Sequence, residues 1–316
     1  MDNVTKRKSQ IDNIRFFLIF LVVFGHFLEL FPGFSSFYKV IYSFHMPAFF
    51  FISGMFARFD RKKIIKHLLI PYFIFQTSYI IFDHQSLTYV TPFWLMWFLL
   101  VLFFYYSFLP LLPAKNLKNG VCVFCGSIVV ALLIGYDKEV GNYLSLSRFF
   151  VFAPFFIAGY YRSCFKNKKF FRLNLSSPFS SMRAFCILFL LGLFVILADR
   201  FLVNYLPSFE ILWGAQNYNV CHCLFWWRFF LQILAISSIG LLFFIFPKKR
   251  ILWITRLGRN TMSIYLLHGF ILLLIKRWDL FHYSPYINLS LAFLYSILII
   301  LLFGNSIVGK FFHKAF

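Results

Sequence analysis

The first apolar stretch of the chain, residues 14–31 (IRFFLIFLVVFGHFLELF), contains two side chains that can exchange protons. His26, with an intrinsic pKa of about 6.5, is suited to general-base chemistry. Glu29 follows three residues later and is expected to orient the ring of His26. Arg15 precedes His26 by eleven residues, so a helix places both on one face, about 16 Å apart. Ionisable groups inside a membrane are costly and are therefore candidates for function.

Two other stretches carry polar groups in apolar sequence. Within residues 38–57, His45 precedes a proline that kinks or breaks a helix, and Ser53 precedes a glycine that permits close helix packing. Near the other end of the chain, Tyr265 and His268 are three residues apart. Both histidines are candidate hydrogen-bond donors to a developing oxyanion, a contribution of about 3 kcal/mol.

Cations gather at the end of the second stretch. Arg58, Arg61 and Lys62 are followed by two more lysines within a few residues. Such a run normally orients a membrane helix. Together with Arg15, it is also suited to hold a polyanion at the cytoplasmic surface.

Arg148 begins the sixth apolar stretch at the opposite boundary. It is either an interfacial anchor or a contact for a sugar or phosphate. The longest outer loop, residues 204–224, contains aromatic and amide side chains. These side chains suit sugar binding, and they fit an aromatic belt at the membrane interface equally well.

The elements that position these residues are expected to be membrane helices. The 316 residues are 61% hydrophobic and 13% charged, more apolar than a soluble domain. An all-α integral membrane protein with one membrane-embedded domain, residues 1–316, is therefore predicted. Ten expected spans cover residues 14–31, 38–57, 68–82, 93–112, 120–136, 148–162, 184–203, 225–246, 261–276 and 287–308.

Charge supports this count. With the N-terminus in the cytoplasm, 24 of the 31 Lys and Arg residues fall in the cytoplasmic segments, as the positive-inside rule expects. Both termini are then cytoplasmic. The net charge of +21 is read as a topology signal, not as nucleic-acid binding. The six cysteines lack the spacing of zinc ligands, so no metal is expected.

Four motifs occur in order between about residues 11 and 308: IDNIRFFLIFLVVFGH, FHMPAFFFISGMF, RFFVFAPFFIAGYY and GRNTMSIYLLHGF. In these motifs the chain resembles the integral-membrane acyltransferases of acyltransferase family 3, and within that family the fucose-4-O-acetylase-like branch. Many members carry an additional extracytoplasmic domain, whereas this chain stops after the tenth expected span. The acceptor is thus expected to meet the membrane domain or a separate protein.

The resemblance implies transfer of acetyl from cytoplasmic acetyl-CoA to a hydroxyl of a surface glycan, such as an O-antigen, a capsule or another polysaccharide. It also implies the bacterial inner membrane as the location. Direct transfer and an acyl-enzyme route both remain open, as do the acceptor sugar and the oligomeric state.

Two other functions fit buried ionisable residues. A transporter or exporter of polysaccharide precursors would use them to line a path, but the inverted repeats typical of that class are not found in the sequence. A non-catalytic partner in polysaccharide assembly is supported by no specific motif.

Overall fold

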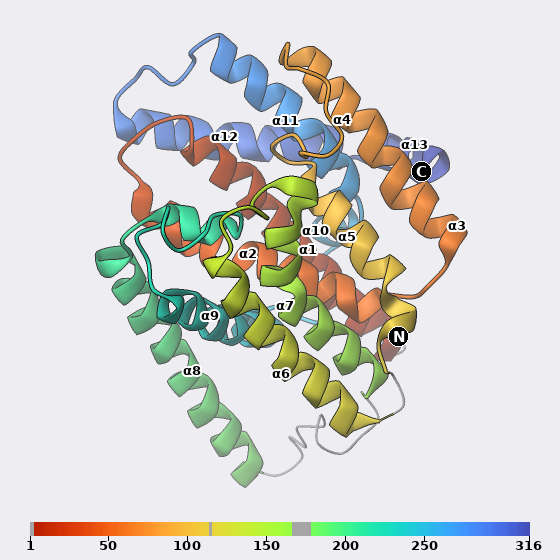
Figure 1. Cartoon of the computed structure of the whole chain (residues 1–316), viewed down its shortest axis with the longest axis vertical. Helices are drawn as coiled ribbons and strands as arrows, with labels where there is room; N and C mark the ends of the chain where they lie inside the picture. Colours follow the sequence, from red (N-terminus) through yellow and green to blue (C-terminus); the bar gives the residue numbers. More distant parts are fainter. Residues whose placement is uncertain (1–2, 114–115, 166–177) are drawn as a thin grey trace.

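The computed structural model describes residues 3–113, 116–165 and 178–316, and within these ranges it contains helices and no strands (Figure 1). Residues 166–177, which belong to the expected cytoplasmic segment between the sixth and seventh spans, lie outside them. The helices are α1 Asn3–Leu28, α2 Ser35–Phe56, α3 Arg61–Ile64, η1 Ile65–Leu69, α4 Ile70–Phe82, α5 Trp97–Ser107, η2 Leu109–Leu111, α6 Leu117–Leu133, η3 Ile134–Tyr136, η4 Tyr143–Ser145, α7 Leu146–Cys164, α8 Pro178–Tyr205, η6 Phe209–Trp213, α9 Phe225–Ile245, α10 Leu252–Arg259, α11 Thr261–Arg277, α12 Pro285–Phe303 and α13 Ser306–Ala315.

The prediction of an all-helical membrane protein is confirmed. In the described part of the chain, six helices are long and apolar enough to cross a membrane, or seven if the bent pair α10–α11 counts as one. Each of the ten expected spans coincides with a helix, but α2, α5 and α8 are not among the six. In α2, the polar residues Lys39, Ser43 and His45 lower the mean hydropathy. The number ten therefore stays a prediction.

Some boundaries differ from those expected. The first helix ends at Leu28, so Glu29 lies beyond it. The tenth expected span, 287–308, is divided: α12 ends at Phe303, and Asn305 then accepts hydrogen bonds from the backbone N–H groups of Ile307 and Val308. This side-chain cap starts a separate helix, α13, because it satisfies N–H groups that a helix start leaves free.

The ends of the helices gather on two sides of the molecule. On one side, Asn13 near the start of α1 donates to the carbonyls of Pro247 and Lys249 after α9. On the other side, Lys39 at the start of α2 donates to the carbonyl of Val203 near the end of α8. The side that holds the N-terminus is called the inner side below, and the opposite one the outer side.

A close crossing of α2 and α7 forms the centre of the fold, with α3–α4, α6 and α8 at its periphery (Figure 1). A Cβ atom at Gly54 would lie 2.0 Å from the carbonyl oxygen of Phe156. One at Gly159 would lie 1.9 Å from that of Phe51. Only glycine allows this approach, which explains the glycines of the second and third motifs.

Candidate functional site

His26 and His268 meet between α1 and α11, although they are 242 residues apart in the sequence. Nδ1 of His26 lies 3.2 Å from Nε2 of His268, and the two rings stack with centroids 5.4 Å apart. His268 is fully buried, whereas His26 lines a cavity. The structure thus gives His26 a histidine as its partner, where Glu29 was expected.

The hydrogen bonds assign the tautomers of this pair. Nδ1 of His268 lies 3.0 Å from the carbonyl oxygen of Ile264 and 2.8 Å from that of Tyr265. Since a carbonyl only accepts, Nδ1 of His268 carries the proton, and its Nε2 is an acceptor in the neutral ring. His26 must then donate through Nδ1. Its Nε2 keeps a free lone pair, so His26 is prepared to accept a proton from a group in the cavity.

His45 lies on α2 and lines the same cavity. Its Nδ1 is 2.7 Å from the carbonyl oxygen of Ile41, one turn earlier, and its ring is buried. The same reasoning places the proton on Nδ1 and leaves Nε2 as an acceptor. In their neutral forms neither His45 nor His268 therefore offers a free donor to an oxyanion, the role expected for them from sequence.

The cavity that these residues face has a volume of about 400 Å³. It lies between α1, α2, α7, the segment before α5 and the segment 211–216. Its lining residues are Val22, His26, Glu29, Tyr42, His45, Met46, Thr91, Pro92, Trp94, Leu95, Trp97, Phe98, Asn142, Arg148, Phe152, Leu212, Trp213, Ala215, Gln216 and Tyr265. The outer loop 204–224 thus forms part of its wall.

Arg148 is the cation of this cavity. Its Nε donates to the carbonyl of Trp213, 3.1 Å away, and its guanidinium stacks over Trp97 at 4.9 Å. The ion pairs found among the described residues do not include it. Its two terminal nitrogens therefore remain available to an anionic or hydroxyl-bearing ligand.

Glu29 lies at the outer end of the cavity. It bonds to tyrosines and does not contact the ring of His26, which it was expected to orient. Its carboxylate accepts hydrogen bonds from Tyr42 at 2.5 Å and from Tyr38 at 3.4 Å, and the indole of Trp94 lines both cavities beside it. Trp213 in turn donates to the hydroxyl of Tyr38 at 2.6 Å. This network ties the end of α1, α2 and the outer loop together.

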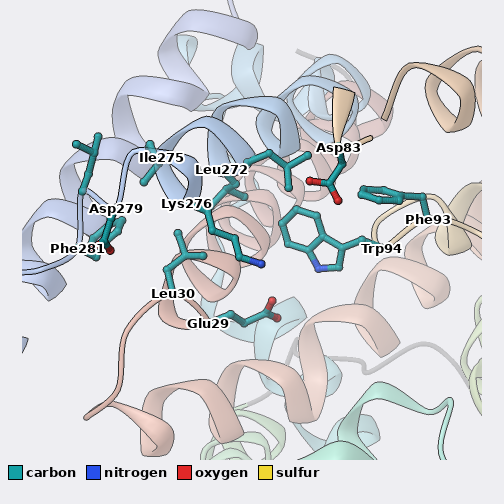
Figure 2. A pocket seen from close by; sticks show the side chains of 12 residues that line it. Glu29, Leu30, Asp83, Phe93, Trp94, Leu272, Ile275, Lys276, Asp279 and Phe281 are labelled. Carbon is teal, nitrogen blue, oxygen red and sulfur yellow. The ribbon is translucent and has the colours of Figure 1, made fainter. Parts of the chain in front are cut away.

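A second cavity, of about 390 Å³, lies on the other side of Glu29 and Trp94, both of which line it as well (Figure 2). Figure 2 shows Lys276 pointing into this space toward Glu29, with Asp83 near the indole of Trp94. Asp279 and three aromatic rings complete its polar and aromatic lining. The two cavities adjoin across the Glu29–Trp94 wall.

Arg15 lies at the inner side, outside both cavities. Its guanidinium stacks over the ring of Phe56 at 4.9 Å and lies 3.9 Å from a carboxylate oxygen of Asp12. Val22 is the nearest lining residue on α1, about 10 Å further along the helix. Close to this end, the backbone carbonyl of Ser53 accepts from Tyr106. Arg15 and Ser53 therefore lie between the cavity and the inner side of the molecule.

Of the remaining predicted residues, the three cations lie away from the histidine pair and Tyr265 lies beside it. Arg58, Arg61 and Lys62 are exposed at the end of α2 and the start of α3. Tyr265 lines the cavity with its ring, while its hydroxyl donates to the carbonyl of Leu95. It thus fixes the segment before α5 and has no free hydroxyl for a substrate.

Sequence reasoning did not identify Tyr42, Trp94, Trp97 and Lys276 as lining residues. Aromatic residues are abundant in this chain, with 50 Phe, 17 Tyr and 7 Trp, and rings that face lipid look the same in sequence. Trp94 lies two residues after Pro92, close to a polar break between apolar runs. This position is the one local sign that its ring does not simply face lipid.

Comparison with models of protein families matches residues 8–304 to one described as an acyltransferase domain. The match includes the histidine pair and every residue that lines the two cavities. No curated protein and no solved structure matched the chain.

Proposed function

Because the chain belongs to acyltransferase family 3 and has several membrane-spanning helices, we propose that it transfers acetyl from cytoplasmic acetyl-CoA to a glycan hydroxyl. We place it in the bacterial inner membrane. The acceptor is a surface polysaccharide such as an O-antigen or capsule, or its lipid-linked precursor. The observation that carries the proposal is the free Nε2 of His26. His268 holds the other ring nitrogen, and the cavity that His26 lines also contains Arg148.

The proposed reaction uses His26 as the base. The acceptor oxygen attacks the thioester carbonyl carbon; a C–O bond forms and the C–S bond breaks. The hydroxyl proton passes to Nε2 of His26 and then to the leaving sulfur of CoA. Arg148 holds the acceptor or the developing oxyanion through its free nitrogens. In an acetyl-histidine route, the same nitrogen would instead attack the thioester as the nucleophile, so both routes depend on His26.

The donor enters from the inner side in this account. Its phosphates need cations, and Arg15 lies on the helix that leads to His26. Arg58, Arg61 and Lys62 are the further candidates for the phosphates. This direction requires the ten crossings with both termini in the cytoplasm, in which α2, α5 and α8 also span the membrane. The gathering of the helix ends on two sides supports that arrangement.

The acceptor enters from the outer side. The second cavity offers carboxylates from Glu29, Asp83 and Asp279, one cation from Lys276, and aromatic rings (Figure 2). Carboxylates accept hydrogen bonds from sugar hydroxyls, whereas their excess over cations disfavours a polyanion such as CoA. We therefore assign this cavity to a sugar of the acceptor, next to the reaction site.

Membranes that contain the protein, incubated with acetyl-CoA labelled in its acetyl group, test this function. We expect label in the polysaccharide fraction, and about 10²-fold less with His26→Ala at equal protein level. His282→Ala is the matched control, because His282 is exposed and lines neither cavity. Movement of polysaccharide precursor across the membrane without label would favour a transporter instead.

A further inference from the structure

A third concave site lies on the inner side, between α10 and α13. Its volume is about 390 Å³, and four cations line it: Arg250, Arg256, Arg259 and Lys310. Thr255, Asn260 and Ser306 complete the lining, which contains no acidic residue among those described. Of the four cations, Arg259 donates through Nε to a carboxylate oxygen of Asp12, 2.9 Å away, so Arg250, Arg256 and Lys310 carry the unneutralised charge. Converging cations and hydroxyl groups around one hollow are the chemistry of a phosphate site.

The fold brings these cations together from distant segments. α10 and α11 meet at an angle of 74° at Asn260, whose side chain donates to the carbonyls of Gly304 and Asn305. The junction of α10 with α11 is thereby tied to the junction of α12 with α13. Gly258 packs against the backbone of Asp12, so α10 is also fixed to α1. The hollow is therefore a built feature of the helix junctions.

Exposed apolar side chains lie on the same two helices as this basic hollow. Leu252 and Trp253 on α10 are 67% and 59% exposed, and Ile307 and Phe311 on α13 are 80% and 67% exposed. Both helices follow closely on candidate spans, α9 and α12, so they lie at the level of a membrane surface. Short helices with apolar and cationic residues at this level lie in the interface and contact lipid.

We propose that this hollow binds the phosphate group of an anionic phospholipid from the surrounding membrane. The cations contact the phosphate, and the exposed apolar residues of α10 and α13 contact the acyl chains. The nucleotide phosphates of CoA share the phosphate chemistry, but acetyl-CoA has no long acyl chains to cover the exposed apolar residues of both helices. The inference does not depend on the proposed function.

Native mass spectrometry of the full chain in mild detergent tests the site. Phosphatidylglycerol is titrated as the anionic probe, and phosphatidylcholine, which is zwitterionic and carries no net charge, is the comparison lipid. We expect preferential retention of phosphatidylglycerol. At about 1 kcal/mol per cation, the double variant Arg256→Gln/Lys310→Gln should bind it about 30-fold more weakly. The replaced side chains are exposed, so the melting temperature without added lipid should not change.

The matched control is Lys248→Gln/Lys314→Gln, which removes the same charge from neighbouring exposed positions that do not line the hollow. It should keep the affinity for phosphatidylglycerol of the unaltered protein. Equal losses in both double variants would overturn the proposal. Competition by acetyl-CoA for the bound lipid, with a loss of acetyl-CoA affinity in the first variant only, would overturn it too and assign the hollow to the donor.

Discussion

At the scale of single residues, a histidine orients His26 where a hydrolytic triad would use a carboxylate. His268 is fully buried among helices, and a buried charge there would be costly. Two backbone carbonyls, of Ile264 and Tyr265, fix its tautomer without adding charge. In the proposed reaction, His268 therefore acts through His26, as a positioning residue.

This role predicts a graded response at position 268. His268→Ala should lower kcat about 10²-fold and leave the KM for acetyl-CoA unchanged, because the base loses its orientation but the donor site is untouched. His268→Gln should recover part of the rate, since its amide oxygen can accept from Nδ1 of His26. The pH–rate profile should keep its shape in both variants. An unaltered kcat in His268→Ala would refute the positioning role.

Arg148 should affect acceptor binding or the transfer step and leave donor binding intact. Arg148→Ala is expected to raise the KM for the acceptor or to lower transfer, while equilibrium binding of labelled acetyl-CoA persists. Arg148→Lys should restore transfer only in part, because the bidentate geometry and the stacking on Trp97 are lost. Equal weakening of donor binding would place Arg148 on the donor side instead.

At the scale of the elements, the apolar runs predicted where helices lie, because a membrane allows few other structures. They did not predict the separate helix α10, whose polar Arg256 and Arg259 interrupt the pattern. Nor does any local signal indicate that His26 meets His268 or that Lys276 faces Glu29. Such contacts depend on how the helices cross, which side chains hundreds of residues apart decide together.

The crossing of α2 with α7 yields a prediction about stability. Gly54→Ala should destabilise the protein by about 3 kcal/mol or more, since its Cβ would overlap backbone atoms that cannot move locally. Thermal unfolding of the purified protein in detergent measures this. Gly126→Ala is the control: nothing lies within 4 Å of its added Cβ, so its unfolding temperature should not fall. An unfolding temperature of Gly54→Ala equal to that of the unaltered protein would contradict the close crossing of α2 and α7.

At the scale of the whole molecule, the proposed function requires donor and acceptor to approach from opposite sides of the membrane. The orientation of the chain in the membrane can be tested without an activity assay. In a variant without the six native cysteines, Asn219→Cys should react with an impermeant thiol reagent in intact cells. Lys62→Cys should react only after the membrane is opened. Both positions are exposed, so access to them depends on the side of the membrane. The reverse pattern would invert the topology.

The central claim is that Nε2 of His26 accepts the proton during acetyl transfer from one side of the membrane to a glycan on the other. Mass spectrometry of surface polysaccharide from cells with the unaltered protein or with His26→Gln, at equal protein level, tests it most directly. The account predicts an acetyl increment on one sugar with the unaltered protein and its absence with His26→Gln, which keeps a hydrogen-bonding side chain but no base. Full acetylation with His26→Gln would contradict the account.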